Sequence, residues 1–155
     1  MKKRLAYLKD TKKLKFNDVD GVQTFVISNY TYVKDDGDRW HFPWESWVTK
    51  KADCEDYAIT MIDLVKRYFG EKLDLIILKK YEGKQKVWHA CLYDGAVIWD
   101  STARQRIDLN NSDWEYETVI AYNFIPITII WKRFTWRLIK ILKRIKKCLK
   151  MDSSR

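Results

Sequence analysis

The chain has 155 residues and a formal net charge of +9 at pH 7, a length that suits one domain with a substantial core. No apolar run is long enough to span a membrane and no signal peptide is recognisable, so the sequence predicts a cytoplasmic or phage-associated protein. Its three cysteines are an odd number without metal-ligand spacing. This pattern argues against a disulfide framework and favours a reducing compartment.

The positive charge is confined to the C-terminal segment. Residues 1–125 hold 20 Lys and Arg and 20 Asp and Glu, whereas residues 126–151 hold nine Lys and Arg and no acidic residue. We therefore expect an N-terminal arm over 1–20, a catalytic domain over 21–125, and a basic amphipathic helix with its tail over 126–155.

The elements before the first cysteine are less strongly predicted. Residues 22–33 have the β-branched and aromatic composition of a strand, with a helix as the alternative. Residues 35–38 read Asp-Asp-Gly-Asp, which predicts a turn rather than a calcium loop because the full EF-hand pattern is absent.

A cysteine stands where a loop is expected to become a helix. Asp53 is a suitable N-cap, apolar residues recur at helical spacing from Ala58 onward, and Gly70 is a stop signal. Cys54 would then lie in the first turn, where the helix dipole favours a nucleophilic thiolate. The structural alternative is a small buried hydrophobic side chain.

A predicted hairpin supplies a histidine and a carboxylate. Strands are expected over 87–93 and 96–100, joined by Asp94-Gly95, a strong two-residue turn signal. Tyr93 then pairs with Ala96, so that His89 lies opposite Asp100 and on the same face. A carboxylate in this position can orient the imidazole as a base. A structural His–Asp contact is the alternative, but together with Cys54 the pair predicts a triad.

Further strands are expected on both sides of this hairpin. Residues 73–81 predict a buried strand, and residues 117–122 predict a last strand before the C-terminal helix.

These residues resemble the bacterial transglutaminase-like cysteine proteinases, within the wider papain-fold group. The resemblance rests on Asp38-Arg39-Trp40-His41-Phe42-Pro43-Trp44-Glu45, on Asp53-Cys54-Glu55-Asp56-Tyr57-Ala58, and on His89 and Asp100, and it covers roughly residues 20–122. It implies an α+β, papain-like fold in which the nucleophile helix packs on an antiparallel sheet. Ala52 replaces the family's glycine, which would be strained if that position required a positive φ.

The resemblance also implies supporting residues. In the family an upstream side chain joins the cysteine N–H in holding the oxyanion, and Trp40 and Gln23 are the candidates here. Asp53 and Glu55 match positions that bind calcium in some relatives. His41 is a rival base, placed second because no carboxylate is registered with it.

The predicted activity is amide hydrolysis or acyl transfer by a Cys54–His89–Asp100 triad. Water as acceptor gives a peptidase or amidase and an amine gives a transglutaminase; the resemblance favours a peptidase acting on protein or peptide. No cofactor is required, and calcium is an optional ligand. The alternative is a catalytically silent structural or interaction module, in a virion or at a membrane, that acts through its basic helix.

The C-terminal helix, expected over about 127–150, carries one apolar stripe and a basic remainder. It could pack on the domain, lie on an anionic membrane surface, or bind a partner protein or nucleic acid. No nucleic-acid fold signature accompanies it, which makes nucleic acid the less favoured partner. The candidate contact residues are Arg133, Arg137, Lys140, Lys143, Arg144 and Lys147.

Overall fold

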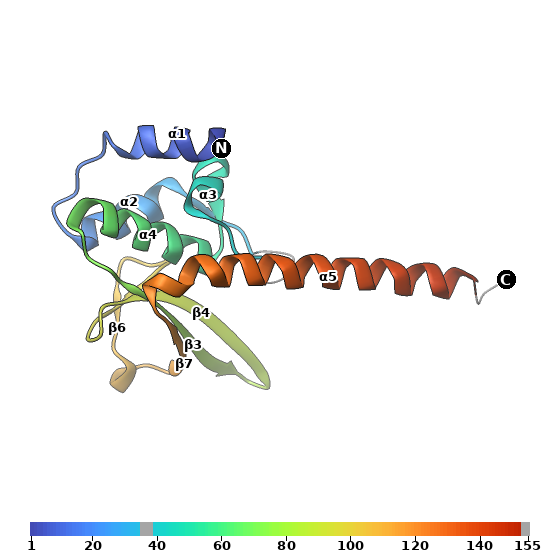
Figure 1. Cartoon of the computed structure of the whole chain (residues 1–155). Coiled ribbons are helices and arrows are strands. Elements are labelled where there is room, and N and C mark those ends of the chain that lie inside the picture. The colour runs from blue at the N-terminus through green and yellow to red at the C-terminus, as the bar shows by residue number, and fades with distance from the viewer. Residues whose placement is uncertain (35–38, 153–155) are drawn as a thin grey trace.

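The structure, a computed structural model, describes residues 1–34 and 39–152, with side chains described up to residue 143. A layer of helices lies above an antiparallel sheet, and one long helix extends away from both (Figure 1). The helices are α1 (Lys2–Thr11), α2 (Val19–Asn29), α3 (Pro43–Thr49), α4 (Cys54–Phe69) and α5 (Ile125–Asp152), with short 3-10 turns η1 (Leu109–Asn111) and η2 (Tyr122–Phe124). The mixed α+β architecture predicted from the sequence is confirmed.

The main sheet has five strands in the order β6-β5-β4-β3-β7, and all neighbours are antiparallel. These strands are β3 (Asp74–Glu82), β4 (Gln85–Tyr93), β5 (Ile98–Asp100), β6 (Arg106–Ile107) and β7 (Glu115–Ile120). A separate parallel pair, β1 (Thr31–Tyr32) and β2 (Lys51–Ala52), joins the segment after α2 to the segment that leads into α4.

Helix α4 begins and ends at the signals expected from the sequence. Asp53 caps it by accepting a hydrogen bond from the Asp56 N–H at 3.3 Å, and Gly70 ends it in the left-handed region with φ 77°. Its apolar face packs on β4 and β3 and forms the main core with Ala90 and Leu92. Burial of each large apolar side chain there stabilises the fold by about 1.5–3 kcal/mol.

The opposite face of the sheet has a second, smaller core. Ile76, Leu78, Cys91 and Ile98 are buried there. Leu109 and Trp114, from the segment after β6, pack against them. The sheet is therefore covered on both faces, and residues of β4 alternate between the two cores.

The first residues of the chain belong to the helical layer. Tyr7 of α1 is fully buried, its hydroxyl donates to Asp63 of α4 at 2.6 Å, and its ring lies 5.4 Å from that of Trp47. The segment expected as an arm thus contributes an anchor to the shared core, while the domain boundaries proposed above stay predictions.

Residues 22–29 are helical, so the strand prediction for this segment is wrong and its helical alternative is correct. Asp18 caps α2 by accepting from the Gly21 N–H at 2.7 Å. Val22 and Val26, one helical turn apart, are both fully buried. The composition favoured a strand, but the cap and the four-residue spacing decided the local structure.

The hairpin between β4 and β5 also differs from the prediction, because its loop has four residues rather than two. Tyr93 pairs with Ile98, and Asp100 pairs with Cys91. The Asp94 carboxylate accepts from the N–H groups of Ala96 and Val97 at 2.8 and 2.7 Å, which lengthens the turn. The register moves by two residues, and such a shift leaves every side chain on its expected face.

Helix α5 is attached to the body only near its start. Ile125 and Ile129 are buried in the main core, and the helix then runs outward into solvent (Figure 1). In the described part of the chain, no helix combines the length and apolar character needed to cross a membrane.

Candidate active site

Cys54 is the first residue of α4. The first N–H groups of a helix have no acceptor within it, so the Cys54 N–H is available to an incoming oxygen. The side chain is partly buried. The sequence therefore places a thiol and a free backbone donor at the same helix end.

A cavity of about 770 Å³ opens beside this helix end. Cys54 and His89 both line it, as do Trp40, Trp88 and Lys132. Cys54 and His89, which are 35 positions apart in sequence and are expected to act together, therefore line the same cavity. A volume of this size is in the range of ligand pockets.

The cavity lies against residues 85–90 of β4. β5 pairs with residues 91–93, the following part of the same strand. The Ala90 carbonyl, at the border between the two parts, accepts from the Ser101 hydroxyl at 2.6 Å. The part of β4 without a β5 partner therefore contributes His89 to the cavity that Cys54 also lines.

His89 and Asp100 are in contact, as predicted. Nε2 of His89 lies 2.9 Å from Oδ1 of Asp100, and both side chains are largely buried. Because the register is shifted, the two residues are diagonal neighbours rather than directly opposite. The Trp114 ring lies 5.3 Å from the imidazole and restricts it from the other face.

Several donors hold the Asp100 carboxylate. It accepts from the N–H groups of Thr102 and Ala103 at 2.8 and 3.0 Å, and from the Gln105 amide at 3.2 Å. Burial by itself would raise the pKa of this carboxyl, but His89 and these donors together hold its pKa well below the usual range. An ionised Asp100 accepts from Nε2–H, so Nδ1 of His89 is the nitrogen left to act as a base.

Gln23 supports this arrangement from α2. Its amide nitrogen donates to the backbone carbonyls of Asp100, Ala103 and Gln105 at 2.7, 3.0 and 3.1 Å. The residue is buried and does not line the cavity beside Cys54. Gln23 therefore stabilises the loop that follows Asp100. This differs from the oxyanion role expected from the sequence.

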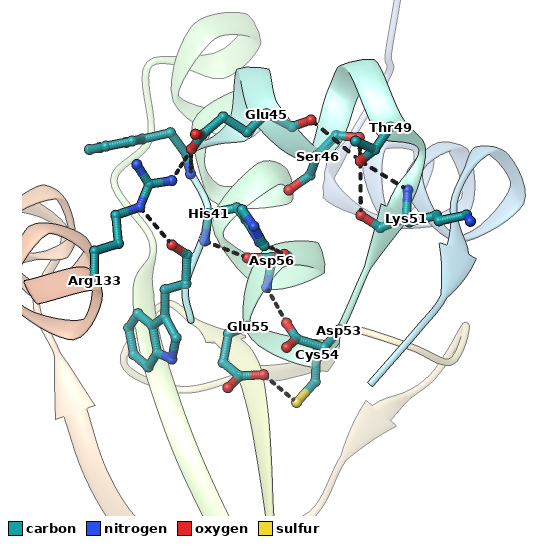
Figure 2. A network of polar contacts seen from close by, with 12 residues as sticks. His41, Glu45, Ser46, Thr49, Lys51, Asp53, Cys54, Glu55, Asp56 and Arg133 are labelled. Atoms are coloured by element: carbon teal, nitrogen blue, oxygen red, sulfur yellow. Dashed lines mark hydrogen bonds and ion pairs between the residues drawn. The ribbon is translucent and has the colours of Figure 1, made fainter. Parts of the chain in front are cut away.

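The thiol of Cys54 is engaged with a neighbouring carboxylate. Sγ donates to Oε2 of Glu55 at 2.9 Å (Figure 2), and no hydrogen bond joins it to the described His89 ring. Burial raises the pKa of Cys54, the negative charge of Glu55 raises it further, and the Ala90 N–H opposes both. These effects favour the protonated thiol in this conformation.

His41 has a carboxylate partner, contrary to the expectation from sequence. Its Nδ1 lies 2.6 Å from Oδ2 of Asp56, and its backbone N–H donates to Oδ1 of the same residue at 2.7 Å (Figure 2). Asp56 is 1% exposed and His41 does not line the cavity. The pair joins the segment before α3 to α4, a contact that no local pattern could reveal.

Trp40 forms one wall of the cavity and is tied to α5. Its side chain is buried, and its backbone carbonyl accepts from Nε of Arg133 at 3.0 Å. The same guanidinium contacts the Glu45 carboxylate (Figure 2), and the ammonium group of Lys132 lies 5.2 Å from the centre of the indole ring.

No protein-family model and no curated protein sequence matches the chain, but its fold matches solved structures. Legionella pneumophila LapG matches with a TM-score of 0.60 at 18% identity, over 86% of this chain and 87% of that one. Its calcium-bound form matches with a TM-score of 0.59 at 19% identity, over 77% and 74%. A candidate cysteine protease from Cytophaga hutchinsonii matches with a TM-score of 0.51 at 19% identity, over 76% and 41%. The chain has the transglutaminase-like fold.

Within this transglutaminase-like fold, Ala52 adopts no strained backbone. Among the described residues other than glycine, the positive φ belongs to Lys50, at 53°, where α3 ends. Ala52 is a buried residue of β2. The substitution of glycine is therefore tolerated because the left-handed residue lies two positions earlier.

Two features of this site were missed from the sequence. The donors of the Asp100 loop were visible only as Asp-Ser-Thr, a composition typical of side-chain-capped turns. Trp114 comes from a polar segment after β6, and its contact with His89 depends on the tertiary fold. Cys91 is fully buried in the second core and does not line the cavity, in agreement with a packing role.

The basic residues expected on α5 have different surroundings. Arg133 contacts the body, whereas Arg137, Lys140 and Lys143 are exposed. Arg144, Lys147 and the predicted turn at 35–38 lie outside the residues or side chains that the structure describes.

Proposed function

We propose that the protein is a cysteine-nucleophile amide hydrolase of the peptidase type, with Cys54, His89 and Asp100 as its triad. One observation carries this proposal: Cys54 at the start of α4 and His89, held by Asp100, line the same cavity. Its similarity in fold to cysteine-protease neighbours supports the same class of chemistry.

The reaction begins with proton transfer from Sγ of Cys54 to Nδ1 of His89. The thiolate attacks the carbonyl carbon of an amide, and the carbonyl oxygen becomes an oxyanion. Collapse of this intermediate breaks the C–N bond, and His89 returns its proton to the departing amine. Water then attacks the thioester carbonyl while His89 takes a proton from it. Breakage of the C–S bond releases the acid product, and His89 returns the proton to Sγ of Cys54.

Two donors are proposed for the oxyanion. The Cys54 N–H is one, because it belongs to the unpaired first turn of α4. The indole N–H of Trp40 is the other, because this residue lines the cavity and its backbone is fixed by Arg133.

The observed thiol must first leave Glu55. A change of the Cys54 side-chain rotamer transfers Sγ from the Glu55 carboxylate toward His89, and rotamer changes of this kind are rapid. The structure therefore corresponds to a resting state in this scheme, and this state exchanges with the reactive rotamer in the free protein.

Calcium is not needed for these steps. A calcium ion takes about six to eight oxygen ligands, whereas the described residues include no group of three or more acidic, histidine or cysteine side chains that could hold a metal. Asp53 already caps α4 and Glu55 accepts from the thiol. These two carboxylates do not form a calcium site by themselves, so calcium stays a proposal that rests on the family resemblance and on the calcium-bound form of the LapG neighbour.

A second function is favoured by the thiol's environment. A protonated Cys54 bound to Glu55 is what a catalytically silent module of this fold would retain. Such a protein would act through its surfaces, with α5 as the foremost candidate.

Cleavage of a peptide library by the wild type and by Cys54→Ser, with products identified by mass spectrometry, tests the proposed function. We expect new carboxyl termini with the wild type and none with Cys54→Ser. Added methylamine would be captured as an amide if an amine can replace water, which would indicate a transglutaminase. Equal products from both proteins would contradict a Cys54 nucleophile.

A further inference from the structure

An apolar stripe on α5 is exposed along its described length. Its side chains have exposed fractions between 47% and 64%, although residues of this type normally lie inside a protein. The stripe consists of Ile127, Ile130, Trp131, Phe134, Leu138, Ile141 and Leu142. A contiguous exposed apolar surface of this extent indicates an interaction site.

The body of the protein does not cover this stripe. Among the described residues, α5 contacts the body through Ile125, Ile129, Lys132, Arg133 and Trp136. At 3.6 residues per turn these positions lie roughly half a turn around the axis from the stripe. Of the three alternatives left open for this helix, packing of the apolar stripe on the domain is not seen among the described residues, since a different face of α5 makes that contact.

A second copy of the chain fits the stripe poorly. The spacing of Ile127, Trp131, Phe134, Leu138 and Ile141 is that of a heptad seam, but residues 126–151 carry nine Lys and Arg and no acid. Pairing two such helices would bring like charges together with no opposite charge to offset them. Ile130 and Leu142 also widen the stripe beyond a narrow coiled-coil seam.

An anionic membrane surface offers the negative charge that residues 126–151 lack and an apolar environment for the stripe. Basic amphipathic helices with aromatic and aliphatic residues on one face lie in the headgroup region, with that face in the acyl boundary. The exposed basic side chains Arg137, Lys140 and Lys143 lie outside the stripe, on the polar part of the helix, and are attracted by the negative surface potential of an anionic leaflet. We propose that α5 binds the surface of an anionic lipid bilayer through its apolar stripe.

This binding would hold the cavity in a fixed orientation to the bilayer. Arg133 ties α5 to Trp40 and Glu45, and Lys132 lines the cavity next to the membrane-facing Trp131. The membrane site is independent of the chemistry at Cys54, so it can exist with or without amide hydrolysis.

Flotation of the full-length protein with vesicles tests this site. Vesicles of phosphatidylcholine mixed with phosphatidylglycerol are compared with vesicles of phosphatidylcholine alone at physiological ionic strength. We expect the protein to float with the anionic vesicles and to remain at the bottom with the neutral ones. Equal flotation with both, or with neither, would overturn the proposal.

Variants separate the apolar and the charged contributions. Trp131→Ser combined with Phe134→Ser should weaken binding about tenfold or more for each residue, and Lys140→Gln combined with Lys143→Gln about fivefold for each. Tyr81→Ser combined with Tyr116→Ser is the matched control, because these aromatics are 60% and 56% exposed on the sheet. The control should bind as the wild type does. All substituted side chains are exposed, so the variants should fold.

Two results would assign the stripe to another partner. A lipid-free dimer in sedimentation velocity that Trp131→Ser with Phe134→Ser dissociates, without flotation, would show that a second copy covers it. Flotation that survives this apolar variant but not the lysine variant, together with binding to a DNA duplex, would show attraction by charge alone. Either result would overturn insertion of the stripe into a membrane.

Discussion

The chain contains two histidine–carboxylate pairs, and only one of them faces the thiol's cavity. Nε2 of His89 lies 2.9 Å from Asp100, and Nδ1 of His41 lies 2.6 Å from Asp56. His89 lines the cavity with Cys54. His41 does not line it, and pairs with the Asp56 carboxylate, which is 1% exposed. The shorter of the two contacts, between His41 and Asp56, is therefore the one that lies away from the cavity and has a structural role.

The comparison shows that a histidine–carboxylate contact does not by itself identify a base. What distinguishes the pairs is the space that each histidine faces. His89, whose Nε2 contacts Asp100, lines the cavity with Cys54, while His41, whose Nδ1 and backbone N–H both contact Asp56, does not line it. In the proposed mechanism the first pair transfers a proton to and from Cys54, and the second pair fixes the segment before α3 to α4.

The largest expected effect separates the two carboxylates. Asp100→Ala should lower the rate of peptide cleavage about 10³-fold or more, because no acceptor then holds Nε2–H of His89 and keeps the imidazole in the reactive tautomer. Asp56→Ala should leave the cleavage rate of folded protein unchanged. Rates are measured on a peptide identified in the library, and folding is monitored by circular dichroism. Equal loss in both variants would remove the distinction between the pairs.

On stability, the pair away from the cavity should have the larger effect. His41→Ala leaves the buried Asp56 carboxylate without its partner and should lower the free energy of unfolding by about 3 kcal/mol. His89→Ala should change it less, because Thr102, Ala103 and Gln105 still donate to Asp100. Urea unfolding at neutral pH measures both. If His41→Ala proved stable but unreactive at Cys54, the role of base would pass to His41.

A third carboxylate, that of Glu55, contacts the Cys54 thiol and can be tested separately from the two histidine partners. Glu55→Gln removes a negative charge that raises the pKa of Cys54 and should increase thiolate and alkylation at neutral pH about tenfold. Glu71→Gln, at an exposed position away from the cavity, is the matched control. The rate of alkylation as a function of pH measures the effect. An unchanged profile would mean that Glu55 does not hold the thiol in solution.

The smallest expected effect is the acid dependence of stability. The pKa of Asp100 is depressed on folding, so its stabilising contribution is present above about pH 4 and is lost as the pH falls through the folded value. Between pH 6 and pH 3 the wild type should lose about 1 kcal/mol more stability than Asp100→Asn. Urea unfolding at the two pH values tests this. Equal losses would show that the carboxylate is not specially held.

The sequence was sufficient for the parts of the site that depend on local signals. Asp53 as N-cap, Cys54 in the first turn and Gly70 as stop all follow from the chemistry of helix ends. The contact of His89 with Asp100 was predicted with the wrong loop length. It was still found because an error of two residues leaves both side chains on the same face.

The remaining features depend on contacts between distant segments. The partner of His41 is 15 positions away on another element, and Gln23 reaches a loop 77 positions away. The apolar stripe on α5 could be predicted from the sequence. The face of α5 that contacts the body could not. Ile125 and Ile129, which decide this, are two apolar residues among many in the segment.

Iodoacetamide labelling at about pH 6, followed by peptide mass spectrometry, tests the triad most directly. The wild type is compared with His89→Ala and with His41→Ala. An ordinary thiol with a pKa of about 8.5 reacts slowly at this pH. The triad predicts rapid modification of Cys54 that His89→Ala slows and His41→Ala leaves unchanged. Slow modification of Cys54 in all three proteins would contradict an activated nucleophile and would favour the catalytically silent module.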